Sequence, residues 1–306
     1  LSFLVKITGL FYLAGALAFL TFHEQTVAAG AGGGPARGAP VYRLALGIGA
    51  ATAVAALVAL VWSRGPRELW YSVTPPAVVA GVLLWHEGVA RSRGSWERFA
   101  RLAGLATPFI AGAALPLVLF AIPYVASGAL GDLLAGVFQI PSRRLGQAVI
   151  LPPPVLLSLF TGLPLVLFLQ TAVGPRSWTD LERLLVVVFL GITLLGATKQ
   201  AGMYQLVWHS ARALVPLGVL AAALALVRAR QSALGRQQLL LLLAMTALGS
   251  LVQLPFSASV YFCYVAPLAV LTAVAVLAAA GRPSAFAPTA AGVFYLAFAV
   301  LLTNRS

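Results

Sequence analysis

Arg143 and Arg144 are adjacent cations of a type suited to recognising a phosphate group. They follow a stretch, 127–141, in which apolar residues recur at helical spacing: Leu130, Leu133, Leu134, Val137 and Phe138. This spacing predicts a short amphipathic helix lying in a membrane interface. Because guanidinium groups bind phosphate oxygens in a bidentate fork, the pair could hold the phosphate or diphosphate of a lipid. The alternative is that both side chains only reach towards the headgroup layer.

Lys6 is a second candidate for lipid-phosphate binding, because it lies near the start of an apolar run. A lysine at membrane depth is costly and usually faces the protein interior, where it serves a function. The alternative is a lysine that flanks a span and contacts the interface.

Trp208 and His209 belong to an unusually polar stretch, 199–212, between apolar runs. An indole ring could stack on a sugar, and an imidazole could serve as an acid or base. A histidine without a visible carboxylate partner is more often structural.

Gln253, Tyr261 and Tyr264 surround a break in an uncharged run of 45 residues, Gln237 to Gly281. The two tyrosines are three residues apart and therefore share a helix face. These neutral hydrogen-bonding groups could line a pocket for sugar hydroxyls or an acceptor. The alternative interpretation is an aromatic belt at the membrane surface.

The acidic residues offer no obvious catalytic pair. There are seven, and the sequence places each of them in or beside a loop: Glu24, Glu68, Glu87, Glu97, Asp132, Asp180 and Glu182. The absence of a carboxylate inside a span argues against a proton-coupled transporter. The chain has no Gly-Lys-Ser/Thr phosphate loop, no spaced metal ligands and a single cysteine, Cys263, so we expect no metal site and no internal disulfide.

The elements that would position these residues are membrane-spanning helices. Of 306 residues, 61% are hydrophobic and 9% are charged, and the charges are bunched between apolar runs. Leu102 to Gly131 and Leu145 to Pro175 carry no charge over 30 and 31 residues. Runs of this length predict an all-α, polytopic transmembrane bundle forming one domain over 1–306. About ten spans are expected, at 1–22, 43–63, 69–86, 102–126, 149–171, 184–198, 211–228, 237–255, 259–280 and 285–303.

Loop charges predict the orientation. Twelve arginines fall in one set of alternate loops, whereas the opposite set and the C-terminal tail hold seven cations. The positive-inside rule places the first set in the cytoplasm and the segments 127–148, 196–212 and 254–260 outside. The net charge of +13 therefore indicates contact with anionic membrane lipids, and no nucleic-acid partner is expected.

Three landmarks together resemble the bacterial GT-C superfamily of polyprenyl-phosphate-dependent glycosyltransferases. The Lys6-Ile7-Thr8-Gly9 opening, the stretch 123–144 and the segment from Gln253 through Tyr261 and Tyr264 to Pro267 are similar to that family's branch of dolichyl-phosphate-mannose–protein mannosyltransferase-like and lipopolysaccharide-core-transferase-like enzymes. The similarity covers the chain as the C-terminal portion of such a protein, in a multi-pass fold in the bacterial inner membrane.

The resemblance implies transfer of a sugar from a polyprenyl-phosphate donor to a lipid, glycan or protein acceptor outside the cytoplasm. It places Arg143 and Arg144 near the donor phosphate. The family's catalytic acid lies on an early external loop, which we expect upstream of Leu1, so no catalytic residue is carried over and the piece alone is expected to be inactive. A divalent metal assists some members, although no ligand set is visible here.

Two other function classes stay open. An O-antigen polymerase or ligase-like protein would use external arginine and histidine, and a transporter or flippase would show internal repeats and embedded charges. No internal repeat is evident. A purely structural membrane subunit is compatible with the same composition.

Overall fold

The computed structural model describes residues 9–30, 40–89, 94–139, 151–171, 178–228, 232–254, 257, 259–281 and 285–302. Every regular element in these ranges is helical, which confirms the predicted all-α class. The longer helices are α2 (Gly9–Gly30), α3 (Pro40–Val61), α5 (Thr74–Val89), α6 (Ser95–Ala126), α9 (Val155–Gln170), α10 (Asp180–Lys199), α11 (Ala201–Arg228), α12 (Ala233–Gly249), α14 (Ala266–Ala279) and α15 (Phe286–Leu302).

Short elements connect several of these helices. They are η1 (Trp62–Arg64), α4 (Pro66–Glu68), the π-helix η2 (Leu69–Val73), α7 (Leu130–Leu134), the π-helix η3 (Ala135–Gln139), η4 (Ser250–Gln253) and α13 (Ser259–Phe262). Lys6, Arg143 and Arg144 lie outside the described residues.

Five helices are long and apolar enough to cross a membrane by length and composition. They cover Pro40–Arg64, Ser95–Ala126, Asp180–Lys199, Ala201–Arg228 and Ala233–Gln253. The described part of each of the ten predicted ranges overlaps a helical segment, but the segments outside these five are shorter, broken or less apolar. We conclude that the chain is a helical membrane protein.

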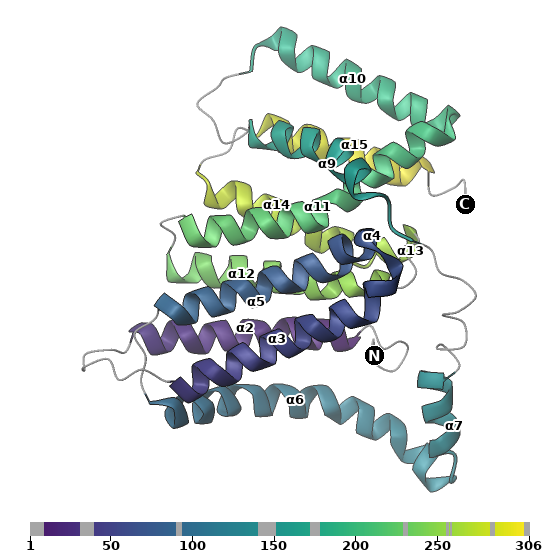
Figure 1. Ribbon diagram of the computed structural model, residues 1–306. Helices are drawn as coiled ribbons and strands as arrows, with labels where there is room; N and C mark the ends of the chain where they lie inside the picture. The colour runs from purple at the N-terminus through teal and green to yellow at the C-terminus, as the bar shows by residue number, and fades with distance from the viewer. Residues whose placement is uncertain are drawn as a thin grey trace.

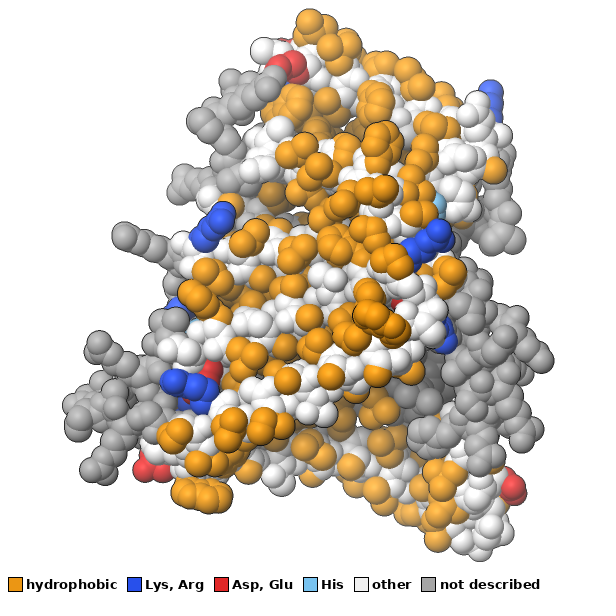
Figure 2. Space-filling model, viewed as in Figure 1, with side chains coloured by type: hydrophobic (Ala, Val, Ile, Leu, Met, Phe, Trp, Pro, Cys, Tyr) orange, Lys and Arg blue, Asp and Glu red, His pale blue; other side chains and the backbone are white. Residues whose placement is uncertain are grey.

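The longer helices run side by side in a stacked bundle, with α6 at one edge and α10 at the other (Figure 1). In the apolar 18-residue stretches of α11 and α12, 44% and 56% of the residues are buried. In the corresponding stretches of α3, α6 and α10, 6% or fewer are buried. The two central helices therefore form the core, and the outer helices expose leucine, valine and phenylalanine side chains (Figure 2). This distribution suits hydrocarbon as the surrounding solvent.

The core is built on buried side chains from several helices. Phe22 of α2, Val79 of α5 and Val219 of α11 pack against Leu240 and Leu243 of α12. Local signals fix where some helices begin. Thr179 caps α10 in a reciprocal capping box with Glu182, and such boxes satisfy free N–H groups of a first turn.

The predicted interfacial helix corresponds to α7 and η3 in its described part, 130–139. It runs across the direction of the bundle helices at the end of α6 (Figure 1). Leu130 and Leu134 are exposed, as a helix whose apolar side faces lipid requires.

The predicted start of the seventh span is wrong. We expected 196–212 to be an external or re-entrant segment, but α11 is continuous from Ala201 to Arg228. Arg212 therefore lies inside a long helix and is only 8% exposed. Charge had been taken to mark a loop, whereas here the charged group is buried by neighbouring helices.

Candidate functional site

A cavity of about 460 Å³ lies at the end of the bundle where α11 begins, called here the cavity end. Its walls come from α4, the extended residues before α9, the first half of α11 and Ser257. The lining residues are Arg67, Leu151, Pro152, Pro153, Pro154, Gln205, Trp208, His209, Arg212 and Ser257. Two of these side chains are cations, and none is acidic.

Helix α11 supplies the polar wall of this cavity. Gln205, Trp208, His209 and Arg212 are separated by three, four and seven positions from the first, so they share one face of the helix. We had grouped Trp208 with His209, and both line this cavity. It adds Gln205 and Arg212, which the same helical spacing could have revealed had the helix been predicted to begin at residue 201.

Arg212 is the principal charged group of the site. Its Nη2 donates a hydrogen bond to the backbone carbonyl of Ser257, while its Nε is buried without a hydrogen-bond partner. None of the ion pairs among the described residues includes Arg212. A buried cation that lacks a counter-charge is costly, and an anion in the cavity would relieve that cost. The site thus suits an anionic group such as a phosphate.

Glu68 follows Arg67 in α4 and is 1% exposed. One carboxylate oxygen accepts a hydrogen bond from Ser72 Oγ at 2.9 Å, whereas the other has no partner. Glu68 lies between the α3 span and the predicted 69–86 span, and burial raises the pKa of its carboxyl group above the ordinary value. It does not line the cavity, and Asp132 is exposed on α7.

The aromatic side of the cavity is held by ring contacts. Trp208 meets Phe262 and Phe298 edge-on, with centroids 5.8 and 5.6 Å apart. Among the described residues, the buried indole Nε1 and the buried His209 Nδ1 have no hydrogen-bond partner. The ring contacts fix the orientation of the indole.

Gln253, Tyr261 and Tyr264 do not line the cavity. Tyr261 packs in the apolar cluster around Phe262, and the backbone carbonyl of Tyr264 accepts a hydrogen bond from Tyr12 Oη at 3.1 Å. Of the five residues predicted for a sugar or acceptor pocket, this cavity therefore contains Trp208 and His209 but not these three. A span boundary brings residues to the same membrane depth without bringing their side chains together.

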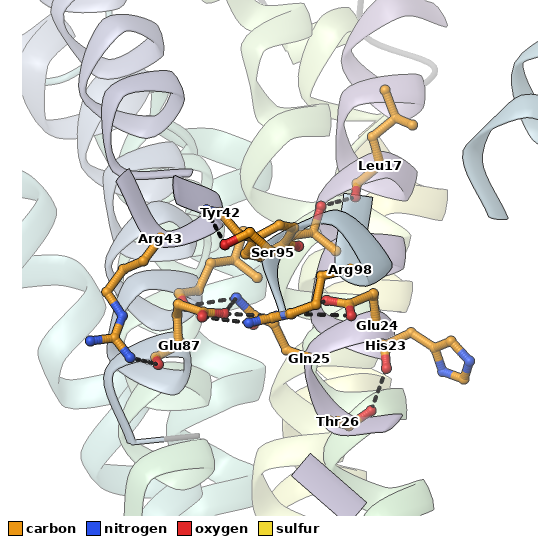
Figure 3. Close-up of polar contacts among 12 residues, drawn as sticks. Leu17, His23, Glu24, Gln25, Thr26, Tyr42, Arg43, Glu87, Ser95 and Arg98 are labelled. Atoms are coloured by element: carbon orange, nitrogen blue, oxygen red, sulfur yellow. Dashed lines mark hydrogen bonds and ion pairs between the residues drawn. The ribbon is translucent and has the colours of Figure 1, made fainter. Parts of the chain in front are cut away.

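A second charged cluster lies at the opposite end of the bundle, called here the Arg98 end, and sequence reasoning missed it (Figure 3). Arg98 of α6 lies between Glu24 of α2 and Glu87 of α5, and all three side chains are fully buried. We had placed both glutamates in or beside loops, but they lie within helices and are enclosed. The sequence offered one signal of their burial, because both glutamates lie a few residues inside apolar helices.

Five hydrogen bonds join the Arg98 guanidinium to the two carboxylates. Gln25 Nε2 donates to Glu87 Oε2 at 3.2 Å, and the Tyr42 ring lies 3.9 Å from the guanidinium carbon. Buried ions need such partners on most of their polar atoms. The cluster is therefore a structural joint of four helices, because all three guanidinium nitrogens already donate to the two carboxylates.

No group of three or more histidine, cysteine or acidic residues in the described part of the chain could hold a metal ion. Comparison of the chain with protein-family models, with curated proteins and with solved structures gives no match. The site geometry is therefore the basis for any functional conclusion.

Proposed function

We propose that this chain forms the lipid-phosphate-binding part of a membrane glycosyltransferase. The enzyme would move a sugar from a polyprenyl-phosphate donor to a lipid, glycan or protein acceptor on the extracytoplasmic side. The observation that carries the proposal is Arg212, a buried cation that has no carboxylate partner among the described residues and lines a cavity also reached by Arg67. Two arginines could balance the negative charge of the donor phosphate both while the donor is bound and as the phosphate departs.

The chemistry requires the negative charge on the leaving phosphate to be stabilised as the sugar bond breaks. Arg212 and Arg67 would supply that stabilisation, and Trp208 would present a flat face to a sugar ring. No acidic residue lines the described cavity, so we assign no catalytic base. The predicted roles of Lys6, Arg143 and Arg144 at the donor phosphate remain part of this proposal.

An apolar groove of about 560 Å³ between α10 and α15 is compatible with an isoprenoid chain. Its lining includes Leu190, Leu194 and Phe294, which belong to the same apolar cluster as Trp208. The groove and the cavity therefore contact one apolar cluster, which supports a ligand with one charged and one hydrocarbon part.

Lipid binding tests the proposal directly. Radiolabelled undecaprenyl phosphate is titrated onto the purified chain in nanodiscs, and undecaprenol, which lacks the phosphate, serves as the ligand control. Arg212→Ala should weaken phosphate-lipid binding at least about tenfold. Arg228→Ala is the matched control, because this exposed arginine ends α11, at the opposite end of that helix from the cavity. Equal binding of the two lipids, or no effect of Arg212→Ala, would refute the role of the cavity.

Transfer activity in membranes tests the enzyme class. Arg143→Ala combined with Arg144→Ala should lower donor-dependent sugar transfer at normal expression. Unchanged transfer would exclude the two arginines from the donor site.

Transport is a second candidate function, and the Arg98 cluster is the observation that favours it. We had used the absence of embedded carboxylates against a transporter, but Glu24 and Glu87 are fully buried. Proteoliposomes holding a fluorescent polyprenyl-phosphate lipid distinguish the two. Translocation without sugar transfer supports the transporter, and transfer without translocation supports the transferase.

A further inference from the structure

Helix α6 is attached to the bundle through one turn near its start. Of its 32 residues, from Ser95 to Ala126, only Arg98 is buried. A helix that packs along its length would bury an apolar stripe, as α11 does. In α6 the buried contact is instead a single cation, Arg98, near the start of the helix.

The attachment involves three other helices. Glu24 and Glu87 bind Arg98 from α2 and α5, and Tyr42 of α3 covers the guanidinium (Figure 3). The neighbouring Ser95 and Phe99 also contact Tyr42, through a 3.4 Å hydrogen bond from its backbone N–H to Ser95 Oγ and a ring contact at 5.1 Å. All these contacts fall within two helical turns.

Beyond this attachment the helix leaves the bundle. Figure 1 shows α6 diverging from α3 towards α7, whose main neighbours are α6 and η3, its own neighbours along the chain. Pro108, Pro116 and Pro123 lie inside α6. Each proline removes a backbone hydrogen bond and permits a bend, so the helix is weakened at intervals along its diverging part.

We propose that α6 and α7 form a lever that pivots at Arg98 and changes the separation of α3 and α6 at the cavity end of the bundle. The pivot is held by ionic bonds that keep their geometry when the distant part of the helix moves. Movement of that part breaks few close packing contacts, because none of its side chains is buried: they are exposed or half-buried. The inference does not depend on the proposed function.

Distance distributions from double electron–electron resonance test the lever in the protein as it stands. Spin labels are placed in a Cys263→Ser background, which removes the single native cysteine. One label stays at Val274 of α14, and the second is at Trp96 or Ile122 on α6. Leu44 and Leu60, at corresponding ends of α3, serve as matched controls. All five side chains are at least half exposed, so labelling leaves the core intact.

The lever predicts a distribution for Ile122 about twice as wide as that for Leu60, with Trp96 as narrow as Leu44. The Ile122 distance should also shift between nanodiscs of short-chain and long-chain lipids. An Ile122 distribution as narrow as that of Leu60 and unchanged between lipids would overturn the proposal. Equal broadening at Trp96 and Ile122 would also overturn it, because α6 would then be loose throughout rather than pivoted.

Discussion

Arg98 Nη2 lies 2.7 Å from Glu24 Oε2, joining residues 74 positions apart in the fully buried part of the bundle. Glu87 meets the same guanidinium from α5. The strongest electrostatic contacts of the described residues therefore lie inside the bundle rather than on its surface, where ion pairs contribute little.

Removing the guanidinium should strongly destabilise the fold. Arg98→Ala leaves two carboxylates buried without their cation, which costs about 3–5 kcal/mol. We expect a large fall in apparent Tm in detergent, measured by the fluorescence of the tryptophans. Arg183→Ala, which removes an exposed partner of Asp180, should change the free energy of unfolding by less than about 1 kcal/mol. Similar effects for the two variants would show that the cluster does not hold the helices together.

Arg212 should behave in the opposite way. Among the described residues, its Nε has no hydrogen-bond partner and its guanidinium forms no ion pair. Replacing Arg212 therefore removes the desolvation cost of a buried charge. Arg212→Met should leave the apparent Tm unchanged or higher while lowering phosphate-lipid binding. Such a separation is typical of residues retained for function at a cost in stability. A Tm loss as large as that of Arg98→Ala would instead assign Arg212 a structural role.

Gly162 sets the approach of α9 to α11. A Cβ at this position would lie 2.4 Å from Ala213 Cβ and 3.0 Å from Leu217 Cδ1. Gly162→Ala should therefore cost about 1–3 kcal/mol through overpacking. Gly191→Ala on α10, where nothing lies within 4 Å, should be neutral or stabilising. Both are measured by thermal unfolding.

The double variant separates contact from backbone effects. Ala213→Gly should recover much of the stability lost in Gly162→Ala, because it removes the atom that collides. Lack of recovery would mean that the loss arises elsewhere.

Glu68 predicts a pH dependence of stability. Burial raises its folded-state pKa above the ordinary value of 4.5, so between these two values the folded protein binds more protons than the unfolded protein. The contribution of Glu68 to the free energy of unfolding is complete below pH 4.5 and is lost as the pH rises through the pKa of its carboxyl group in the folded protein. The apparent Tm of the wild type should fall over this window, whereas Glu68→Gln should lack that component. Parallel curves for both proteins would contradict the shift.

The helical framework was predictable because apolar runs of span length have few other stable forms. The positions of α3, α6 and α10 follow directly from such runs. The cavity was only partly predictable. Trp208 and His209 stood out as polar residues, but the boundary drawn at residue 211 hid their common face with Arg212. Hydropathy treats a charge as the end of a span even where neighbouring helices bury that charge.

The Arg98 cluster could not be derived from the sequence for the same reason. Pairing of Glu24 with Arg98 depends on which helices become neighbours, and no local pattern encodes that. The opposite case is the group Gln253, Tyr261 and Tyr264. We expected these residues at the same membrane depth as Trp208 and His209, but they do not line the cavity.

The unequal lengths of α3 and α6 have a consequence for the surrounding lipid. At 1.5 Å per residue, the uncharged part of α3, from Leu44 to Val61, spans about 27 Å, and that of α6, from Leu102 to Ala126, spans about 38 Å. A bilayer that matches α3 is too thin for an upright α6, and tilting is the usual accommodation of such hydrophobic mismatch. Membrane thickness would then set the tilt of α6, and the chain would respond to its lipid environment as a gauge of thickness.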